Sequence, residues 1–221
     1  MNIVWIMQKD VRYTAAVTAG FTILLFVLPM LSKVLSPVAV FGAAVALSGV
    51  YMITALFSVE RHEERNNGYP FLLRMPILPV EVAAGKLLLM YLHNVLSTGL
   101  LFALIRLSHV DPGSVPVFRS IALAAGCVWL ILVIVSFYGI CMLGYSKFFV
   151  VFRVGVLVLL VAIQAVGVFV LRLDGDLPAR MQQVGASIAG IRWLVVCLVV
   201  SMMYFCLIAV SGRFVKSHTA R

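Results

Sequence analysis

The chain has 221 residues, of which 63% are hydrophobic and 11% are charged, and its mean hydropathy is +1.13. A soluble domain carries about 25% charged residues, so this composition excludes a soluble globular protein and predicts an all-α, polytopic membrane protein. The net charge of +9 is spread along the chain without a basic patch interleaved with aromatic residues, so we expect contacts with anionic lipids and no nucleic-acid partner.

The first 13 residues, MNIVWIMQKDVRY, are too short to span a bilayer, and their apolar residues precede Gln8, Lys9 and Asp10. We expect this segment to lie at the cytoplasmic interface as an amphipathic helix, or to form the frayed start of the first span. Apolar runs near the ~20 residues that cross a bilayer then follow one another along the chain. They predict six transmembrane helices at 14–35, 37–58, 82–107, 121–143, 149–171 and 190–211.

Six spans place both termini on the same side of the membrane. If the termini are cytoplasmic, eleven of the 17 lysine and arginine residues lie in cytoplasmic segments or at the cytoplasmic ends of spans. Cytoplasmic segments of membrane proteins carry the excess of Lys and Arg, so this orientation is favoured. We therefore expect a multi-pass protein of the bacterial plasma (inner) membrane with both termini inside.

The sequence lacks the motifs of intrinsic catalysis. It has no GxxxxGK[ST], so the chain does not bind ATP phosphates in a P-loop by itself. The stretch HEERN, from His62 to Asn66, resembles a zinc-binding HExxH, but position 66 is asparagine. The four cysteines lie within predicted spans and show no metal-binding or disulfide pattern. We expect no enzyme activity, no metal and no cofactor bound by this chain.

One polar stripe interrupts the third predicted span. Lys86, His93 and Ser97 are spaced i, i+7 and i+11, which places them on one helix face, and Asn94 flanks them. The stripe either lines a translocation pathway or forms hydrogen bonds at a helix–helix interface, and the same alternatives hold for Gln164 in the fifth span. Acidic residues are missing from the span centres, which argues against an ion-coupled transporter.

The segment between the second and third spans, residues 59–81, is VERHEERNNGYPFLLRMPILPVE and holds all four glutamates of the chain. Gly68 and Pro70 break the helix that precedes them, and a helix restarts near Val80 with Glu81 in its first turn. The pattern predicts a structured cytoplasmic loop, suited to docking another protein.

This loop, together with six spans and cytoplasmic termini, resembles the membrane subunits of type-2 ABC exporters, the ABC-2-like permeases. Members often show a glutamate, a glycine four residues later, a Leu-Leu pair, Leu-Pro-Ile/Val, and a lysine ten residues after that proline. The matching residues are Glu64, Gly68, Leu72-Leu73, Met75-Pro76-Ile77 and Gly85-Lys86. The chain departs from the pattern at Met75, at Leu78-Pro79 and at the additional Pro70.

The resemblance implies a permease subunit that pairs with a second, identical or similar, subunit, each seated on a separate ATPase subunit that binds ATP and Mg²⁺. Two ATPases per complex would drive alternating access and export a hydrophobic or amphipathic peptide, lipid or drug. The residues expected to contact the ATPase are Glu60, Glu63, Glu64 and Arg65, and those expected to shape the coupling loop are Gly68, Leu72, Leu73, Pro76 and Lys86. The alternatives are a membrane scaffold or accessory subunit of a larger complex, and an ion-coupled transporter.

Overall fold

The computed structural model of the chain describes residues 2–28, 30, 37–66, 68, 78–107, 115–155 and 193–219. These residues form five long helices, namely α1 (Asn2–Val27), α2 (Pro37–Arg65), α4 (Pro79–Leu107), α5 (Val115–Leu143) and α8 (Trp193–Thr219). A further helix, 145–155, follows α5 directly. The all-α prediction is confirmed for the part of the chain that the structure describes.

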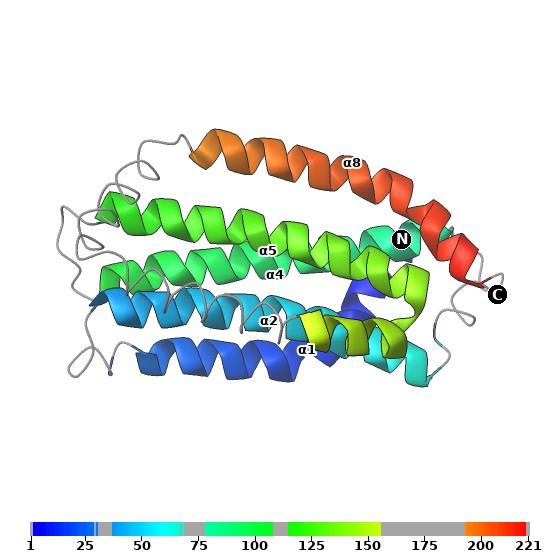
Figure 1. Ribbon diagram of the computed structural model, residues 1–221, viewed down its shortest axis with the longest axis horizontal. Helices are drawn as coiled ribbons and strands as arrows, with labels where there is room; N and C mark the ends of the chain where they lie inside the picture. The colour runs from blue at the N-terminus through cyan, green and yellow to red at the C-terminus, as the bar shows by residue number, and fades with distance from the viewer. Residues whose placement is uncertain are drawn as a thin grey trace.

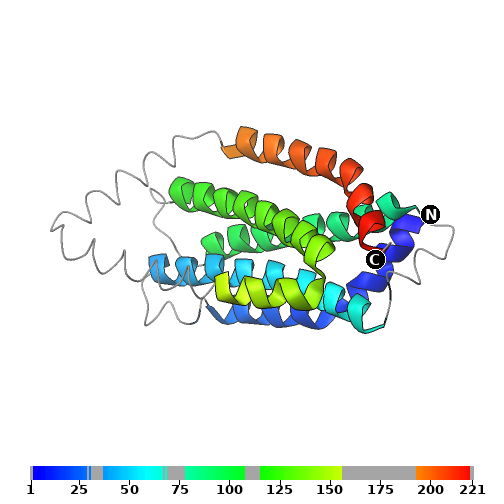
Figure 2. The same ribbon diagram turned by 45° about the vertical axis from the view of Figure 1, so that its right-hand side comes forward.

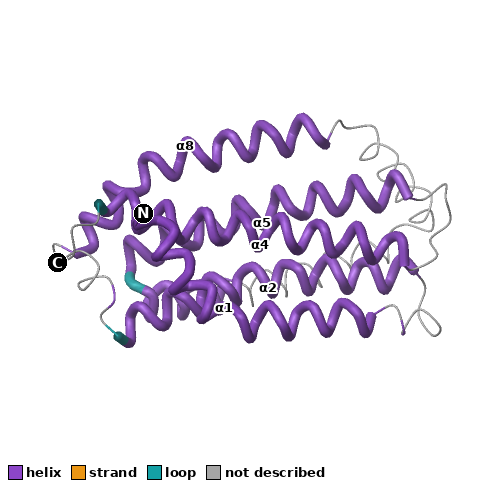
Figure 3. The backbone as a smooth tube through the Cα atoms, turned by 180° about the vertical axis from the view of Figure 1, so that it is seen from behind, coloured by secondary structure: helices purple, strands orange, loops and turns teal. Residues whose placement is uncertain are grey.

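The long helices lie side by side along the long axis of the molecule, and α4 runs through the middle of the bundle (Figures 1 and 3). It packs against α1, α2, α5 and α8. In its first turns every residue from Val82 to Leu87 is buried, so this end of α4 is enclosed on all sides. Further along, the buried residues fall on one face at helical spacing. Lys86 therefore lies in the most enclosed part of the central helix.

Four of the described helices are long and apolar enough to cross a bilayer: Ile3–Val27, Val40–Arg65, Pro79–Leu107 and Val115–Leu143. Their outer faces, and that of α8, carry exposed large apolar side chains, for example Ile23, Val135 and Met202, which are 64%, 58% and 68% exposed. Soluble monomers rarely expose extended apolar surface of this kind. The chain is therefore a multi-pass α-helical membrane protein.

Three of the six predicted spans lie wholly inside described helices, and the span 14–35 begins in α1, which ends at Val27. The spans 37–58, 82–107 and 121–143 fall inside α2, α4 and α5. Of the last two spans, 190–211 overlaps α8, whose apolar part is Val195–Ile208, and 149–171 begins in helix 145–155 and continues outside the described residues. The total of six spans stays a prediction.

The N-terminal segment is helical from Asn2 and belongs to α1, which continues to Val27. No proline or glycine precedes Gly20, and Ile6 and Asp10 are buried against neighbouring helices. The position of this segment at the membrane interface stays a prediction. Figure 2 shows the first turns of α1, in dark blue, inclined to the remainder of the helix.

The start of α1, the end of α2, the start of α4 and the end of α8 meet at one end of the bundle (Figure 1). We call this the charged end, because Lys9, Glu60, Glu63 and Lys86 all lie there. Described basic residues at the opposite end of the bundle are Arg106, near the end of α4, and Arg119, near the start of α5.

At the charged end the chain reverses after α5. Gly144 has a φ of 79°, in the left-handed region that glycine adopts without steric cost. Its backbone N–H donates to the carbonyl of Ile140 at 2.8 Å, and its own carbonyl accepts from the N–H of Phe148 at 3.0 Å. The reversal therefore leaves the neighbouring backbone groups hydrogen-bonded while redirecting the chain into helix 145–155.

Helix 145–155 packs against α2 through aromatic rings. Phe57 of α2 is buried, and four rings of helix 145–155 lie around it with centroid distances between 5.1 and 6.3 Å. These are Tyr145, Phe148, Phe149 and Phe152, and with Phe57 we call them the aromatic cluster. All four contacts are edge-to-face, the geometry that aromatic pairs prefer.

Candidate functional site

The charged segment predicted as a loop over 59–81 is partly helical. Helix α2 continues to Arg65 and α4 begins at Pro79, so only the residues between them connect the two helices. The stretch from Val59 to Arg65 contains no glycine or proline, and two of its three glutamates, Glu60 and Glu63, face partners inside the bundle. A run of charged residues of this kind is typical of a solvated loop, but here it forms the last turns of α2.

Glu60 and Glu63 lie on the inner face of α2 and pair with lysines from two other helices. Lys86 of α4 donates to Glu60 Oε1 at 2.9 Å, and its Nζ lies 4.0 Å from Glu63 Oε1. Lys9 of α1 donates to Glu63 Oε1. The side chains of Lys86, Glu60 and Glu63 are 1%, 1% and 2% exposed. Both carboxylates therefore face the interior of the bundle in this conformation, where a buried lysine charge requires paired carboxylates. Their expected contact with an ATPase subunit stays a prediction.

Asp10 is a member of this cluster that the sequence analysis did not single out. Its side chain is fully buried, Lys9 Nζ lies 3.4 Å from its Oδ1, and neither carboxylate oxygen has a hydrogen-bond partner among the described residues. The available signal was spacing, because Ile6, Asp10 and Thr14 are four residues apart and all buried on one face of α1. We refer to Lys9, Asp10, Glu60, Glu63 and Lys86 as the ion cluster.

Two glycines of the family pattern adjoin the ion cluster. A Cβ atom at Gly85 would lie 2.8 Å from Ile6 Cγ2, so glycine lets α1 and α4 approach closely beside Lys86. A Cβ atom at Gly68 would lie 2.8 Å from the carboxyl carbon of Glu63 and 3.3 Å from its Cα. Both positions are too crowded for any larger residue without movement of the neighbours.

On the outer side of the charged end, Arg61, Glu64 and Arg65 are exposed. Glu64 holds the start of helix 145–155, because its Oε1 accepts from the backbone N–H of Ser146 at 3.3 Å and its Oε2 accepts from the Ser146 hydroxyl at 2.8 Å. A carboxylate at a helix N-terminus is favourable for the unpaired N–H groups there. Of the four residues expected to contact an ATPase, Glu64 and Arg65 are thus the ones exposed on this surface.

The polar stripe on α4 lies in the interior, on the face that its spacing predicted. His93 Nε2 lies 3.1 Å from the Thr14 hydroxyl, and His93 Nδ1 bonds to the hydroxyl of Tyr51. The Tyr51 hydroxyl lies 3.2 Å from that of Thr18. These hydrogen bonds join α1, α2 and α4. Of the two alternatives for His93, they match hydrogen bonding at a helix–helix interface. Ser97 is buried and donates to the carbonyl of Asn94 at 3.4 Å.

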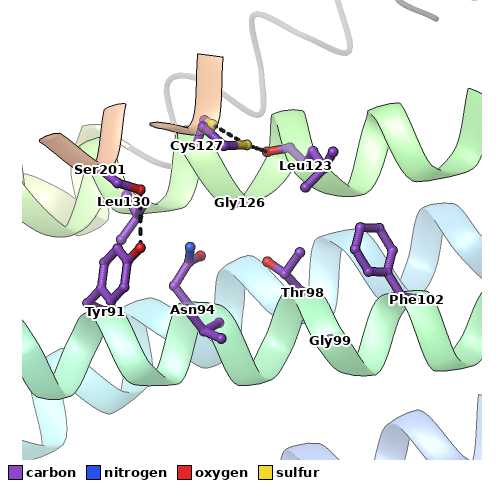
Figure 4. A pocket seen from close by; sticks show the side chains of 12 residues that line it. Tyr91, Asn94, Thr98, Gly99, Phe102, Leu123, Gly126, Cys127, Leu130 and Ser201 are labelled. Atoms are coloured by element: carbon purple, nitrogen blue, oxygen red, sulfur yellow. Dashed lines mark hydrogen bonds between the residues drawn. The ribbon is translucent and has the colours of Figure 1, made fainter. Parts of the chain in front are cut away.

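A cavity of about 290 Å³ lies between α4, α5 and α8, next to this stripe (Figure 4). Asn94 and Thr98 line it from α4, Cys127 from α5, and Cys197 and Ser201 from α8. Asn94 thus faces this cavity, away from the hydrogen-bonded network of His93. Four of the residues named from the sequence, Leu72, Leu73, Pro76 and Gln164, lie outside the described residues.

No protein-family model, curated protein or solved structure matches the chain. Within the described ranges, no group of three or more His, Cys, Asp or Glu side chains is arranged to hold a metal ion. The fold defines the class of the protein, a multi-pass α-helical membrane protein. The features of the described residues that bear on its function are the ion cluster, the charged end and the cavity.

Proposed function

We propose that the chain is the transmembrane permease subunit of an ATP-driven ABC exporter. It would pair with a second permease subunit and with two ATPase subunits, which bind ATP and Mg²⁺. Hydrolysis in the ATPases would drive alternating access in the permease pair and export a hydrophobic or amphipathic molecule. The chain itself would supply no catalytic group.

The observation that carries the proposal is that three residues of the permease-like pattern lie close together in the fold. Lys86 belongs to the ion cluster, and Gly68 and Gly85, which are separated in sequence, both contact it or its immediate neighbours. The Lys86 contacts with Glu60 and Glu63 fasten the end of α2 to the start of α4, at the base of the connecting segment. A close-packed interior transmits displacement instead of absorbing it. A movement of the connecting segment would therefore be transmitted through these contacts to both α2 and α4.

The distribution of charge supports the orientation that the proposal requires. Basic residues of the described ranges gather at the charged end, including Arg61, Arg65 and Lys147, whereas Arg106 and Arg119 mark the other end. An excess of Lys and Arg is typical of the cytoplasmic side, where the ATPases would bind. We propose the exposed Arg61, Glu64 and Arg65 as the surface offered to them.

The test is to purify the tagged chain from the membranes of the cells that produce it and to measure Mg-ATP hydrolysis. We expect a P-loop ATPase to copurify and its activity to be inhibited by vanadate. The double variant Arg61→Glu/Arg65→Glu should lower the copurifying ATPase by about tenfold or more, because two favourable charge contacts become repulsive. The matched control, Arg106→Glu/Arg119→Glu, reverses two exposed charges at the other end and should leave it unchanged.

Absence of a P-loop protein from the purified wild-type complex would overturn the permease assignment and favour a membrane scaffold. Equal effects of the two double variants would reject the charged end as the ATPase surface.

A second candidate, an ion-coupled transporter, gains support from Asp10. The predicted span centres carry no acidic residue, but the structure buries the three carboxylates of the ion cluster at the charged end of helices apolar enough to span a membrane. Buried ionisable groups in spans often mark ion pathways. Accumulation of a cargo by sealed vesicles under a pH gradient without ATP, abolished by Asp10→Asn, would establish this function in place of the first.

A further inference from the structure

We propose that the cavity between α4, α5 and α8 binds a small, neutral amphiphile that donates a hydrogen bond to Asn94. The cavity has a volume of about 290 Å³, near the lower end of the roughly 300–1,000 Å³ that ligand pockets occupy. It corresponds to the liquid volume of about ten water molecules, enough for a short alkyl chain with a polar head.

The unpaired atom is the amide oxygen of Asn94. This residue is 6% exposed, and its Oδ1 has no hydrogen-bond partner among the described residues. Figure 4 shows the side chain projecting from α4 toward α5, between Tyr91 and Thr98 and into the cavity. A buried carbonyl oxygen without a partner is costly, and a ligand with an O–H or N–H donor would remove that cost.

Several other polar groups at the wall have partners. Tyr91 donates to the hydroxyl of Ser201 at 3.2 Å, the sulfur atoms of Cys127 and Cys197 lie 3.4 Å apart, and the Cys197 thiol donates to the carbonyl of Leu123 at 3.9 Å. The buried amide oxygen of Asn94 is therefore the wall atom to which we assign selection of a ligand by hydrogen bonding.

The rest of the wall decides the charge and the shape of the ligand. Val95, Phe102 and Leu130 are among the apolar residues that line the cavity, and none of the described lining residues carries a formal charge. A charged ligand would have no counter-charge there, so a neutral molecule with an apolar body fits best.

Glycine keeps the cavity open. A Cβ atom at Gly99 of α4 would have no other atom within 4 Å, so side chains larger than hydrogen at this position would enter free space. Gly126 of α5 faces Asn94 and Thr98 directly, and a Cβ there would lie 2.9 Å from the Thr98 hydroxyl. Gly99 is therefore the position from which the cavity can be filled with the least disturbance of its wall.

This site goes beyond the proposed export function and does not depend on it, because the described lining residues all come from helices of this chain. The test therefore uses the full chain without an ATPase, reduced and reconstituted in phosphatidylcholine nanodiscs. The probes are 1-nonanol and its isomer methyl octyl ether, which has the same atoms but no hydrogen-bond donor. Native mass spectrometry counts the bound probe, and N-ethylmaleimide alkylation reports access to Cys127 and Cys197, with the exposed Cys206 as internal control.

We expect one nonanol bound per chain and alkylation of the two cavity cysteines slowed about fivefold or more, with little effect of the ether, because only the alcohol pairs with the buried oxygen. Gly99→Leu should abolish nonanol binding by filling the cavity. Gly20→Leu is the matched control, since Gly20, like Gly99, is exposed with open space around a Cβ, but it lies on α1 and does not line the cavity. Asn94→Leu should remove the preference for nonanol over the ether.

Equal binding of the two probes by the wild-type chain, or binding of neither, would overturn the proposal. Nonanol binding that survives Gly99→Leu would overturn it as well, since the alcohol would then occupy another place. Either result leaves the ATPase copurification experiment unaffected, so failure of the site and failure of the permease assignment are distinguishable.

Discussion

Replacing Lys86 by methionine tests the ion cluster most directly. Methionine has a similar length and keeps the packing, but it removes the donor that Glu60 accepts at 2.9 Å and the charge that lies 4.0 Å from Glu63. Loss of one partner of a buried ion pair costs about 3–5 kcal/mol, because the remaining charge is stranded. Glu63 keeps Lys9, whereas Glu60 loses the Lys86 ammonium, and we expect destabilisation by about 3 kcal/mol.

A double variant distinguishes the energy of the Lys86–Glu60 ion pair from the energy of side-chain packing. With Lys86→Met in place, Glu60→Gln removes the carboxylate charge that Lys86 neutralised. The losses of unfolding free energy from the two changes should therefore not be additive, and the coupling energy should be about 1–3 kcal/mol. Lys147 is an exposed lysine on helix 145–155, and Lys147→Met is the matched control, expected within about 0.5 kcal/mol of the wild type.

The measurement is reversible unfolding in mixed micelles, with increasing mole fraction of dodecyl sulfate and detection by tryptophan fluorescence and helical circular dichroism. The free energy of unfolding of each variant comes from linear extrapolation at a common slope. If Lys86→Met lies within about 1 kcal/mol of the wild type, or if the double variant is as unstable as the sum of the singles, the pairing of Lys86 with Glu60 does not stabilise the fold.

Three further substitutions probe the same end of the bundle. Gly85→Val should destabilise by about 1–3 kcal/mol in the same assay, because the new side chain meets Ile6 at a distance where one of the two helices has to move. Glu64→Gln should loosen the start of helix 145–155 by about 0.5–1 kcal/mol, seen as faster amide exchange at Ser146, because an amide is a weaker acceptor than a carboxylate at a helix N-terminus. Asp10→Asn should keep or raise the free energy of unfolding, because it removes a buried charge whose oxygens accept no hydrogen bond among the described residues.

Control substitutions accompany these changes. Gly20→Val on α1 adds the same side chain as Gly85→Val where a Cβ has nothing within 4 Å, and should cost little. Arg61→Gln changes an exposed charge one turn before Glu64 and should leave exchange at Ser146 unchanged. A loss of more than about 2 kcal/mol with Asp10→Asn would mean that the carboxylate is a strong partner of Lys9, contrary to its geometry.

The helices could be predicted from sequence because run length and composition are properties of the chain alone. The spans at 37–58, 82–107 and 121–143 lie inside observed helices, and the spacing of Lys86, His93 and Ser97 placed these residues on a buried face. The sequence placed the helix break at Gly68 and Pro70, and α2 ends shortly before it at Arg65. It gave no sign that the charged turns before the break face lysines, because a dense run of charges is the same in a solvated loop and in a buried helix end.

The pairing of charges was beyond the reach of sequence patterns. Lys86 lies 26 residues after Glu60, and Lys9 lies 54 residues before Glu63, so only the packing of three helices reveals that they neutralise each other. The cavity could not be predicted from sequence patterns either. Asn94, Cys197 and Ser201 line the same cavity only because α8 packs beside α4. Local spacing identified Asn94 as polar but gave no sign of the space in front of it.

The aromatic cluster around Phe57 has a mechanical consequence. Phe57 lies one turn before Glu60 on α2, so the same short stretch of helix is fastened on one side by ions and on another by interlocked rings. Edge-to-face rings resist sliding, because each rim sits against the face of its neighbour. We therefore expect helix 145–155 to move together with α2 when α2 tilts at the charged end. Gly144, with its left-handed backbone, is the residue between these helices and α5 at which the chain direction would change.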